Sequence, residues 1–216
     1  FLSARELLGL HSPWWTVFTG GDFALCRLTP EKYHYNHVPV SGMVVDIYEI
    51  DGACHSCNPG AQIALATLHA KNRRVVTVID TDVAGGSGVG LVALIEVVAL
   101  MIGDIVQCYS EREYDDPQPV VKGMWLTKGC PKSLYRPGSS TDILLFQPNR
   151  VTFCDDLCRN LVRTDVQSRF SSGLGRPLVE TDVRVRSTIA KKRPTTIHPL
   201  YPTMSAHPPL AQEEPQ

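Results

Sequence analysis

The fold class follows from the stretch Arg73-Arg-Val-Val-Thr-Val-Ile-Asp80, which is followed by a Gly85-Gly86 turn and by apolar residues from Leu91 to Ile102. Short runs rich in Val and Ile that are bounded by glycine are typical of β-strands. The same pattern is repeated elsewhere, since Gly42 to Ile50 precedes an Asp-Gly pair and Asp142 to Phe146 precedes a Pro-Asn pair. The sequence therefore predicts strands separated by turns over most of its length.

The remaining segments complete an α+β, mostly β prediction. Leu2 to Leu8 is amphipathic, and Phe153 to Val162 has apolar residues at helical spacing, so we expect a few short helices. Leu178 to Ile189 reads as further strand. From Lys191 the chain is rich in proline and poor in large apolar side chains, which predicts a flexible Pro-rich tail over residues 191–216.

Length and composition narrow the class of protein. The 216 residues are 43% hydrophobic and carry a net charge of -1, which is typical of a globular chain and argues against a nucleic-acid-binding role. The longest apolar run, residues 89–103, has Glu96 near its centre and is shorter than the roughly 20 residues that span a bilayer. We therefore expect it to be buried core. Because the chain starts at Phe1, we expect a processed or truncated piece.

Seven cysteines without regular spacing favour reduced thiols over a disulfide framework. Cys54-His-Ser-Cys57 and the Cys154/Cys158 pair lie nearly a hundred residues apart, so neither spacing is typical of a zinc site. We expect no metal. These thiols read as structural or incidental.

Two polar motifs are candidates for chemistry. His34 and His37 stand three residues apart in a Pro-bounded segment, where one imidazole can donate and the other accept a proton, although two surface histidines would give the same pattern. Gly138-Ser139-Ser140 precedes an apolar strand. A serine hydroxyl in such a turn can attack the preceding carbonyl if a base is near, but Gly/Ser turns before strands are common.

Taken together, these segments resemble the phosphatidylserine decarboxylase family. The order of the blocks is more specific than any one of them, and the resemblance spans roughly Phe18 to Leu161. It rests on Leu28-Thr-Pro-Glu-Lys-Tyr-His-Tyr-Asn-His37, Val38-Pro-Val-Ser-Gly42, Ile50 to Pro59, Val98-Ala-Leu-Met-Ile-Gly-Asp-Ile105, either Val121-Lys-Gly123 or Thr127-Lys-Gly129, and Ser140-Thr-Asp-Ile-Leu-Leu-Phe-Gln-Pro-Asn-Arg-Val151.

The resemblance implies a self-cleaving proenzyme that makes its own pyruvoyl group. Ser140 would attack the carbonyl of Ser139, dividing the chain into a β chain (1–139) and an α chain (140–216) that stay together. The new N-terminus then carries the pyruvoyl group, whose ketone binds the substrate amine and accepts electrons as carbon dioxide leaves. In the same resemblance, His37 is the base for self-cleavage and His34 acts nearer the substrate. Residues 1–190 would form the catalytic domain without its N-terminal part.

The implied reaction is decarboxylation of phosphatidylserine to phosphatidylethanolamine, a step of phospholipid biosynthesis. The phospholipid substrate places the enzyme at a membrane surface, either peripherally or through an upstream anchor, in a compartment that the sequence does not specify. Trp14 and Trp15 are candidates for membrane contact and equally for the core. A homodimer is a further candidate assembly. By analogy with biotinyl and lipoyl carrier domains, the paired turns at residues 39–42 and 127–129 suggest a barrel-like β-sandwich.

Several readings stay open. Gly138 is displaced by one residue from the family's motif, so Ser139 is an alternative nucleophile. Lys32 and Tyr35 replace the usual Asp and Arg of the histidine block. The Asp that orients the base in this family lies upstream of the chain, Asp22 does not take its place, and we expect slow or absent self-processing without it. Rival functions are decarboxylation of a free amino acid such as tryptophan, and a non-catalytic relative or fragment.

Overall fold

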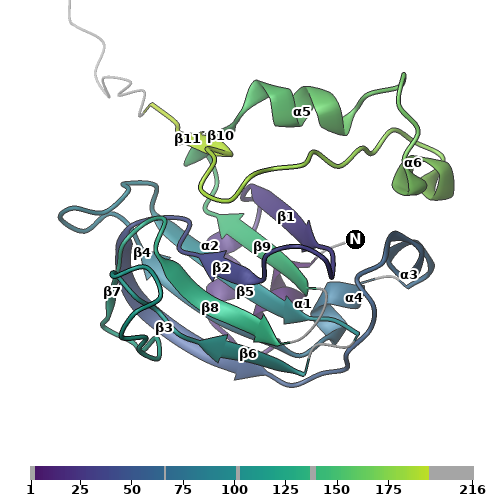
Figure 1. Cartoon of the computed structure of the whole chain (residues 1–216). Helices are drawn as coiled ribbons and strands as arrows, with labels where there is room; N and C mark the ends of the chain where they lie inside the picture. Colours follow the sequence, from purple (N-terminus) through teal and green to yellow (C-terminus); the bar gives the residue numbers. More distant parts are fainter. Residues whose placement is uncertain (1–2, 66, 101–102, 137–139, 195–216) are drawn as a thin grey trace, which may run out of the picture.

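The computed structural model describes residues 3–65, 67–100, 103–136 and 140–194 (Figure 1). Strands predominate, and each of the described helices is short. The strands are β1 (Phe23–Leu28), β2 (Tyr35–His37), β3 (Gly42–Ile50), β4 (Arg74–Asp80), β5 (Leu91–Val98), β6 (Asp104–Gln107), β7 (Trp125–Leu126), β8 (Pro131–Arg136), β9 (Ser140–Phe146), β10 (Val151–Phe153) and β11 (Ala190–Lys192). The helices are α1 (Ala4–Leu8), α2 (Trp14–Phe18), α3 (Pro59–Ala64), α4 (Leu68–Lys71), α5 (Asp155–Leu161) and α6 (Arg169–Leu174).

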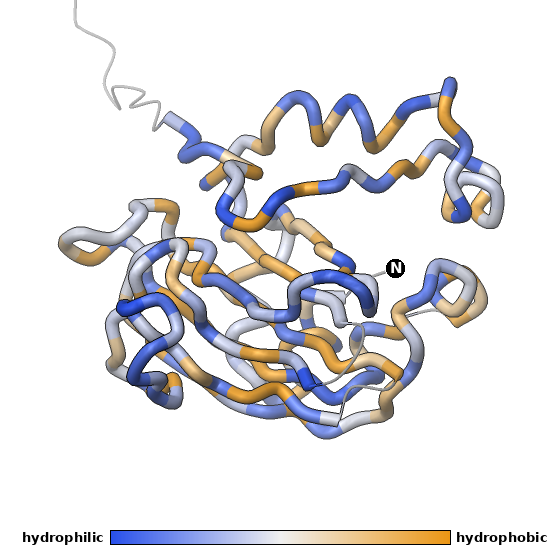
Figure 2. Tube along the Cα trace, in the orientation of Figure 1, coloured by the Kyte–Doolittle hydropathy of each residue, from blue (hydrophilic) through white to orange (hydrophobic). Residues whose placement is uncertain are grey.

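Two antiparallel sheets form the body of the molecule. A six-stranded sheet has the order β1-β9-β5-β4-β3-β7, and a three-stranded sheet has the order β2-β8-β6 (Figure 1). The glycine-bounded strands β4 and β5 pair with each other over their full length. Apolar residues concentrate along the strands of these sheets (Figure 2). The prediction of a mostly β fold with a barrel-like core is confirmed.

The two faces of the large sheet bury different partners, because side chains alternate along a strand. Ala93, Ile95 and Val97 of β5 pack beneath Leu7 and Leu8 of α1. The opposite face of β5 turns toward the small sheet, where Val98 packs with Ile105 of β6 and Tyr135 of β8. We call the space between the two sheets the sheet interior, and the candidate site lies there.

The N-terminal helices are fixed to the large sheet by polar contacts as well. The Arg74 guanidinium is buried and donates to the carbonyl oxygens of Glu6, Leu7, Ala70 and Asn72. Trp14 donates from its indole nitrogen to Asp46 at 2.7 Å. Trp14 and Trp15 both pack against the cluster beneath the helices, and each is partly buried.

The C-terminal part of the described chain departs from the sequence prediction in two places. Residues 178–189 do not form a strand: they run as an irregular segment beside β1, where Glu180 binds Arg27 through two hydrogen bonds. Strand pairing resumes only at β11, so Lys191 and Lys192 belong to a strand and not to the tail. The helix expected within 153–162 is present as α5. The rest of the predicted tail, from residue 195, lies outside the described residues.

Candidate functional site

Ser140 is the first residue of β9 and lies in the interior of the fold. Its register partners are Leu28 of β1 and Val98 of β5, and its side chain exposes none of its surface. Among the described residues its Oγ has no hydrogen-bond partner. Because buried hydroxyls are usually paired, an orphaned Oγ at this position calls for an explanation. Ser139, the alternative nucleophile, lies outside the described residues.

The two histidines of the sequence motif occupy different surroundings. Tyr135 on β8 donates its backbone N–H to the carbonyl oxygen of His34, so the chain is already extended before β2 begins. By strand alternation, His34 then shares the face of Asn36, which is buried in the sheet interior. The His34 Nε2 is buried and has no hydrogen-bond partner in the described part of the chain.

His37 is held by other groups. Its Nδ1 lies 2.7 Å from the carbonyl oxygen of Gly129, and its Nε2 lies 2.7 Å from the hydroxyl of Tyr33. Partial burial lowers the pKa of His37, the hydrogen bond with Gly129 raises it, and the Arg186 cation lowers it further. The structure therefore does not bring His37 into a hydrogen bond with Ser140.

The turn that holds His37 is the one that the sequence paired with residues 39–42. Gly129 has a φ of +86°, which favours glycine, and its N–H donates to the carbonyl oxygen of Val38. The neighbouring Lys128 donates its backbone N–H to the Ser41 hydroxyl at 2.9 Å. The two turns are thus in direct contact.

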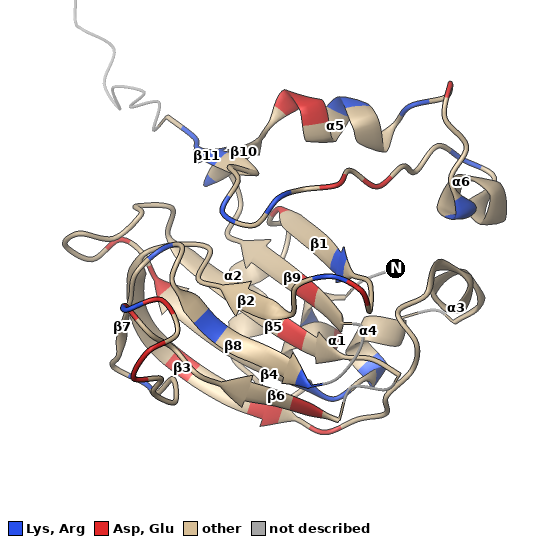
Figure 3. Ribbon diagram, in the orientation of Figure 1, with Lys and Arg blue, Asp and Glu red and all other residues tan. Residues whose placement is uncertain are grey.

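A charged pair links the two sheets across the interior. Lys132 of β8 and Glu96 of β5 form an ion pair of 2.7 Å in which neither side chain is exposed. Figure 3 shows basic colouring on β8 opposite acidic colouring on β5 and β9. Glu96 also accepts from Asn36, Gln107 and Ser133, and Lys132 also donates to Gln107. Burial raises the pKa of Glu96, but Lys132 and these hydrogen bonds outweigh it, so the net direction is downward.

Asp142 lies beside this pair. It is the register partner of Glu96 on β9, and its Oδ1 accepts from the Tyr135 hydroxyl at 2.7 Å. Loss of hydration, and next the neighbouring Glu96 carboxylate, raise the pKa of Asp142 to about 7. Among the described residues, the sheet interior therefore holds the Glu96–Lys132 pair and, beside it, Asp142, whose pKa is raised to near neutral pH.

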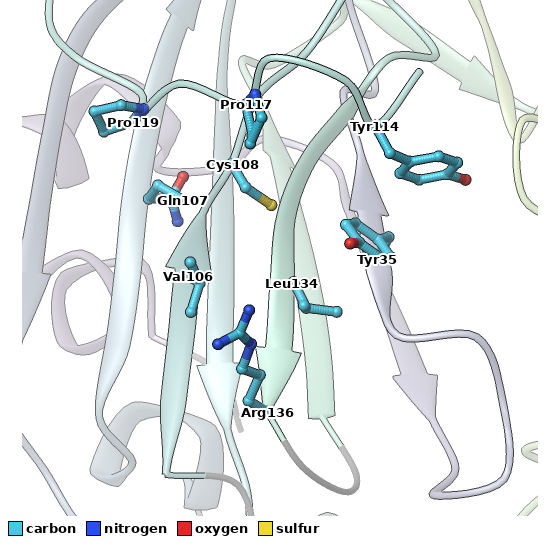
Figure 4. Close-up of a pocket in the computed structure, with 9 residues that line it drawn as sticks. All are labelled: Tyr35, Val106, Gln107, Cys108, Tyr114, Pro117, Pro119, Leu134 and Arg136. Atoms are coloured by element: carbon cyan, nitrogen blue, oxygen red, sulfur yellow. The ribbon is translucent and has the colours of Figure 1, made fainter. Parts of the chain in front are cut away.

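The outer face of the small sheet carries a cavity of about 250 Å³ (Figure 4). Its walls come from the outward-facing side chains of β2, β8 and β6 and from the loop after β6. They include Tyr35, Tyr114, Leu134 and Arg136. Tyr35 and Tyr114 pack edge to face at 4.9 Å between ring centroids. The cavity wall residue Leu134 alternates along β8 with Ser133, which bonds Glu96 in the sheet interior, so this wall belongs to the opposite face of the small sheet.

The cysteines are spread over the fold: Cys26 of β1 is the register partner of Asp142, and Cys108 lines the cavity. All seven cysteines are free, with Cys57 buried and Cys54 exposed. Within the described ranges no three His, Cys, Asp or Glu side chains are grouped to hold a metal ion. Asp22 contributes only its carbonyl oxygen, which accepts from the N–H of Phe146.

Comparison with known proteins identifies the family. The model of the family described as phosphatidylserine decarboxylase matches residues 1–175. The chain belongs to the phosphatidylserine decarboxylase family. This confirms the resemblance seen in the order of the sequence blocks.

Individual relatives of the chain belong to the same family by name. The chain is 31% identical over 140 residues to the phosphatidylserine decarboxylase proenzyme of Ruminiclostridium cellulolyticum, covering 65% of this chain and 41% of that protein. It is 31% identical over 180 residues to the proenzyme of Aliivibrio salmonicida, covering 78% and 60%. Proenzyme 3 of Schizosaccharomyces pombe is 31% identical over 156 residues, covering 72% and 14%. The chain thus spans about half of the length of the bacterial relatives it matches.

The sequence motifs predict Ser140 and both histidines as site residues but not the polar groups of the sheet interior. In the sequence, Glu96 stands out only as an interruption of an apolar run, and Lys132, Tyr135 and Asp142 carry no predicted role. A signal was available for Asp142, because it interrupts a strand that is otherwise apolar, two residues after the candidate nucleophile.

The helices in the described part of the chain are all too short to cross a membrane.

Proposed function

We propose that the chain provides the catalytic core of a phosphatidylserine decarboxylase, which converts phosphatidylserine to phosphatidylethanolamine and carbon dioxide. The observation that carries the proposal is the family match over residues 1–175, together with a buried hydroxyl on Ser140 that has no hydrogen-bond partner among the residues that the structure describes. Membership of the family implies a pyruvoyl group, and the relatives named above are called proenzymes. We place the cleavage at the Ser139–Ser140 bond.

The surroundings of Ser140 fit a pyruvoyl group at that position. A strand start gives the new N-terminus a fixed direction, and register partners Leu28 and Val98 supply apolar walls. The orphaned Oγ is consistent with a hydroxyl that is consumed rather than retained for stability. When formed, the group supplies a ketone that binds the substrate amine and an electron sink for decarboxylation. The chain supplies orientation, exclusion of water and proton transfer.

The histidines are proposed in the roles that the family resemblance gives them. His34 acts nearer the substrate, which suits a buried Nε2 that is free among the described residues to hold or deliver a proton. His37 acts in self-cleavage. In the present arrangement its nitrogens contact Tyr33 and Gly129, so this role requires the Tyr33 contact to be exchanged.

The substrate places the reaction at a membrane surface, and we propose peripheral contact or an anchor outside this chain. The described N-terminal tryptophans are partly buried against the large sheet, with Trp14 bound to Asp46, so both rings already pack within the fold.

The α and β chains would stay together after cleavage, because β9 of the α chain is paired on both sides with β1 and β5 of the β chain.

The test uses carbon dioxide release from carboxyl-labelled substrates. Phosphatidylserine in vesicles should release label, and free tryptophan should not. The Ser140→Ala variant is the matched control and should release none from either. Release from free tryptophan alone would move the proposal to an amino-acid decarboxylase. A chain that stays uncut and releases carbon dioxide from neither substrate would indicate a non-catalytic relative.

A further inference from the structure

The C-terminal arm, which we define as residues 154–194, is held to the body of the molecule, residues 1–153, at several points. Its last strand, β11, pairs with β10. Helix α6 approaches α3 so closely that a Cβ on Gly173 would lie 2.5 Å from Ile63. The segment that returns from α6 binds β1 through Glu180 and Arg27. The arm is therefore a fixed part of the fold (Figure 1).

The arm exposes many hydrophobic side chains. Helix α5 buries none of its side chains, and Figure 2 shows apolar colouring along it. The Val179 N–H donates to the carbonyl oxygen of Leu161, so the returning segment lies beside the end of α5. Five of the twelve large hydrophobic side chains that the described residues expose lie on the arm: Leu161, Val162, Leu174, Val183 and Val185. Exposed apolar groups concentrated on one segment indicate a binding surface.

The charges of the chain are divided unequally between the arm and the body. The arm carries nine Lys or Arg and five Asp or Glu, whereas residues 1–153 carry twelve and fifteen. The arm is thus net positive and the body net negative, and basic colouring recurs along the arm in Figure 3. A basic segment that also exposes apolar side chains is typical of surfaces that bind anionic lipid.

Ion pairs take up most of the acidic side chains of the arm. Glu180 lies 2.7 Å from Arg27, and Asp182 lies 3.9 Å from Lys32, so both carboxylates turn toward the body. A third carboxylate pairs with Arg163 within the arm. Among the described residues, four exposed arginines of the arm form no ion pair: Arg159, Arg169, Arg176 and Arg184. The positive charge of the arm is therefore available to an anionic partner.

We propose that the C-terminal arm is the surface through which the enzyme binds a bilayer containing anionic phospholipid. This inference rests on the proposed function, because the proposed substrate, phosphatidylserine, is itself an anionic phospholipid of the bilayer. The exposed apolar side chains enter the boundary between head groups and acyl chains, and the unpaired arginines contact the head-group phosphates and carboxylates. The net negative body is repelled by the same surface, which orients the molecule with its arm toward the lipid.

A second copy of the chain is the other occupant that would cover the arm. In a twofold dimer the same patch of both copies forms the contact, so two positively charged arms would meet. Like charges that face each other oppose such a contact, whereas an anionic bilayer attracts both the arginines and the apolar groups between them. The charge of the arm therefore favours the bilayer.

The arm also passes close to the candidate site. Arg27, which binds Glu180, is the register partner of Thr141 on β9. The next pair along these strands is Leu28 with Ser140. The arm therefore contacts β1 one register position from the residue proposed to form the pyruvoyl group.

The experiment measures binding of the purified full chain to phosphatidylcholine vesicles, with or without phosphatidylserine, by flotation. Wild type should bind the vesicles that contain phosphatidylserine more tightly, and salt should weaken this binding. Arg159→Gln/Arg176→Gln/Arg184→Gln should weaken it about a hundredfold, because one basic side chain near an anionic surface contributes about fivefold. Leu161→Ser/Val162→Ser should weaken it about tenfold or more.

Matched controls remove the same kinds of group from the body. Lys71→Gln/Arg112→Gln/Lys122→Gln removes three exposed cations, and Val121→Ser removes an exposed apolar side chain. Both controls should bind the vesicles as the wild type does. Because every substituted side chain is exposed, thermal unfolding of all these variants should stay close to that of the wild type.

The outcomes separate this inference from the proposed function. A wild-type chain that does not bind vesicles with phosphatidylserine, or arm variants that bind like the wild type, would overturn the inference. Arm variants that convert a dimer to a monomer in sedimentation, with vesicle binding unchanged, would assign the arm to a second copy and also overturn it. With phosphatidylserine dispersed in detergent, the arm variants should release carbon dioxide at the wild-type rate. Vesicle binding that depends on the arm, without release from any form of phosphatidylserine, would overturn only the proposed function.

Discussion

Lys132 Nζ lies 2.7 Å from Glu96 Oε2, and neither side chain has any surface exposed to solvent. The two residues belong to different sheets, so the pair links β8 of the small sheet to β5 of the large one. Gln107 contacts both members, donating to Glu96 and accepting from Lys132. Since the desolvation of two charges is costly, such a pair stabilises the fold only while both members are present.

Removal of one member of the Glu96–Lys132 pair should therefore strongly destabilise the fold. Lys132→Met leaves the Glu96 carboxylate buried without its cation and should lower the free energy of unfolding by about 3 to 5 kcal/mol. The measurement is urea-induced unfolding at neutral pH. Lys32→Met is the control, because Lys32 lies 3.9 Å from an exposed Asp182, and it should change the stability by less than about 0.5 kcal/mol. Equal effects of the two substitutions would contradict the role given to the buried pair.

His69 should make the fold sensitive to acid. Burial lowers its pKa from 6.5 to about 4, so the folded state binds this proton less readily than the unfolded state does. Stability is then lost as the pH falls from about 6.5 to about 4, by up to ~3 kcal/mol. His69→Leu should flatten this part of the stability profile, whereas the exposed His11→Gln should leave it unchanged. A profile with the same slope in His69→Leu would exclude His69 as the cause.

Asp142 should make the fold less stable as the pH rises, which is opposite to the effect of His69. Its pKa is raised from 3.8 to about 7, so the folded state holds the proton more tightly than the unfolded state does. Stability contributed by the protonated form is lost as the pH rises through this window, by about 2 to 4 kcal/mol. In the uncleavable Ser140→Ala background, Asp142→Asn should gain stability over its parent at alkaline pH and little at acid pH. A constant difference across the range would show that Asp142 does not titrate there.

Arg74 should not be replaceable by lysine. Its buried guanidinium donates to two carbonyl oxygens of α1, to one of α4 and to that of Asn72 directly after α4. An ammonium group cannot reproduce this planar arrangement. Arg74→Lys should destabilise the fold by about 2 to 4 kcal/mol in thermal or denaturant unfolding. Arg73→Lys is the neighbouring control, since Arg73 is partly exposed and pairs with Glu49 at the surface. The same loss in both variants would contradict this role.

Much of the fold could be predicted because the local sequence of most strands is enough to identify them. The apolar residues of β4 and β5 and the glycines between them give strand length and turn without knowledge of any neighbour. The prediction of a strand over residues 178–189 is wrong, because pairing depends on more than the local sequence. The segment has β-like residues and runs beside β1, the edge strand of the large sheet, but the contact there is the side-chain pair of Arg27 and Glu180 and not a backbone ladder.

The site could be predicted only as a set of isolated residues. Ser140, His34 and His37 were identified from their motifs, but which face of a strand each occupies depends on register, and register is set by pairing between distant segments. Alternation along β2 separates His34 from His37, and the bulge between Asn36 and His37 is not evident in the sequence. The pKa of Asp142 is raised first by burial and then by Glu96 on β5, and both depend on how distant segments pack.

Intact mass measurement of the purified, denatured chain tests the central claim most directly. Cleavage at the Ser139–Ser140 bond predicts two species, residues 1–139 and residues 140–216, the second lighter than the serine-started peptide by the mass of ammonia because its N-terminus is a pyruvoyl group. Ser140→Ala should give only the uncut chain. Because self-processing of this chain is expected to be slow, the two species should accumulate on incubation. An uncut mass that stays unchanged on prolonged incubation, or fragments that meet at any other bond, would contradict self-processing at Ser140.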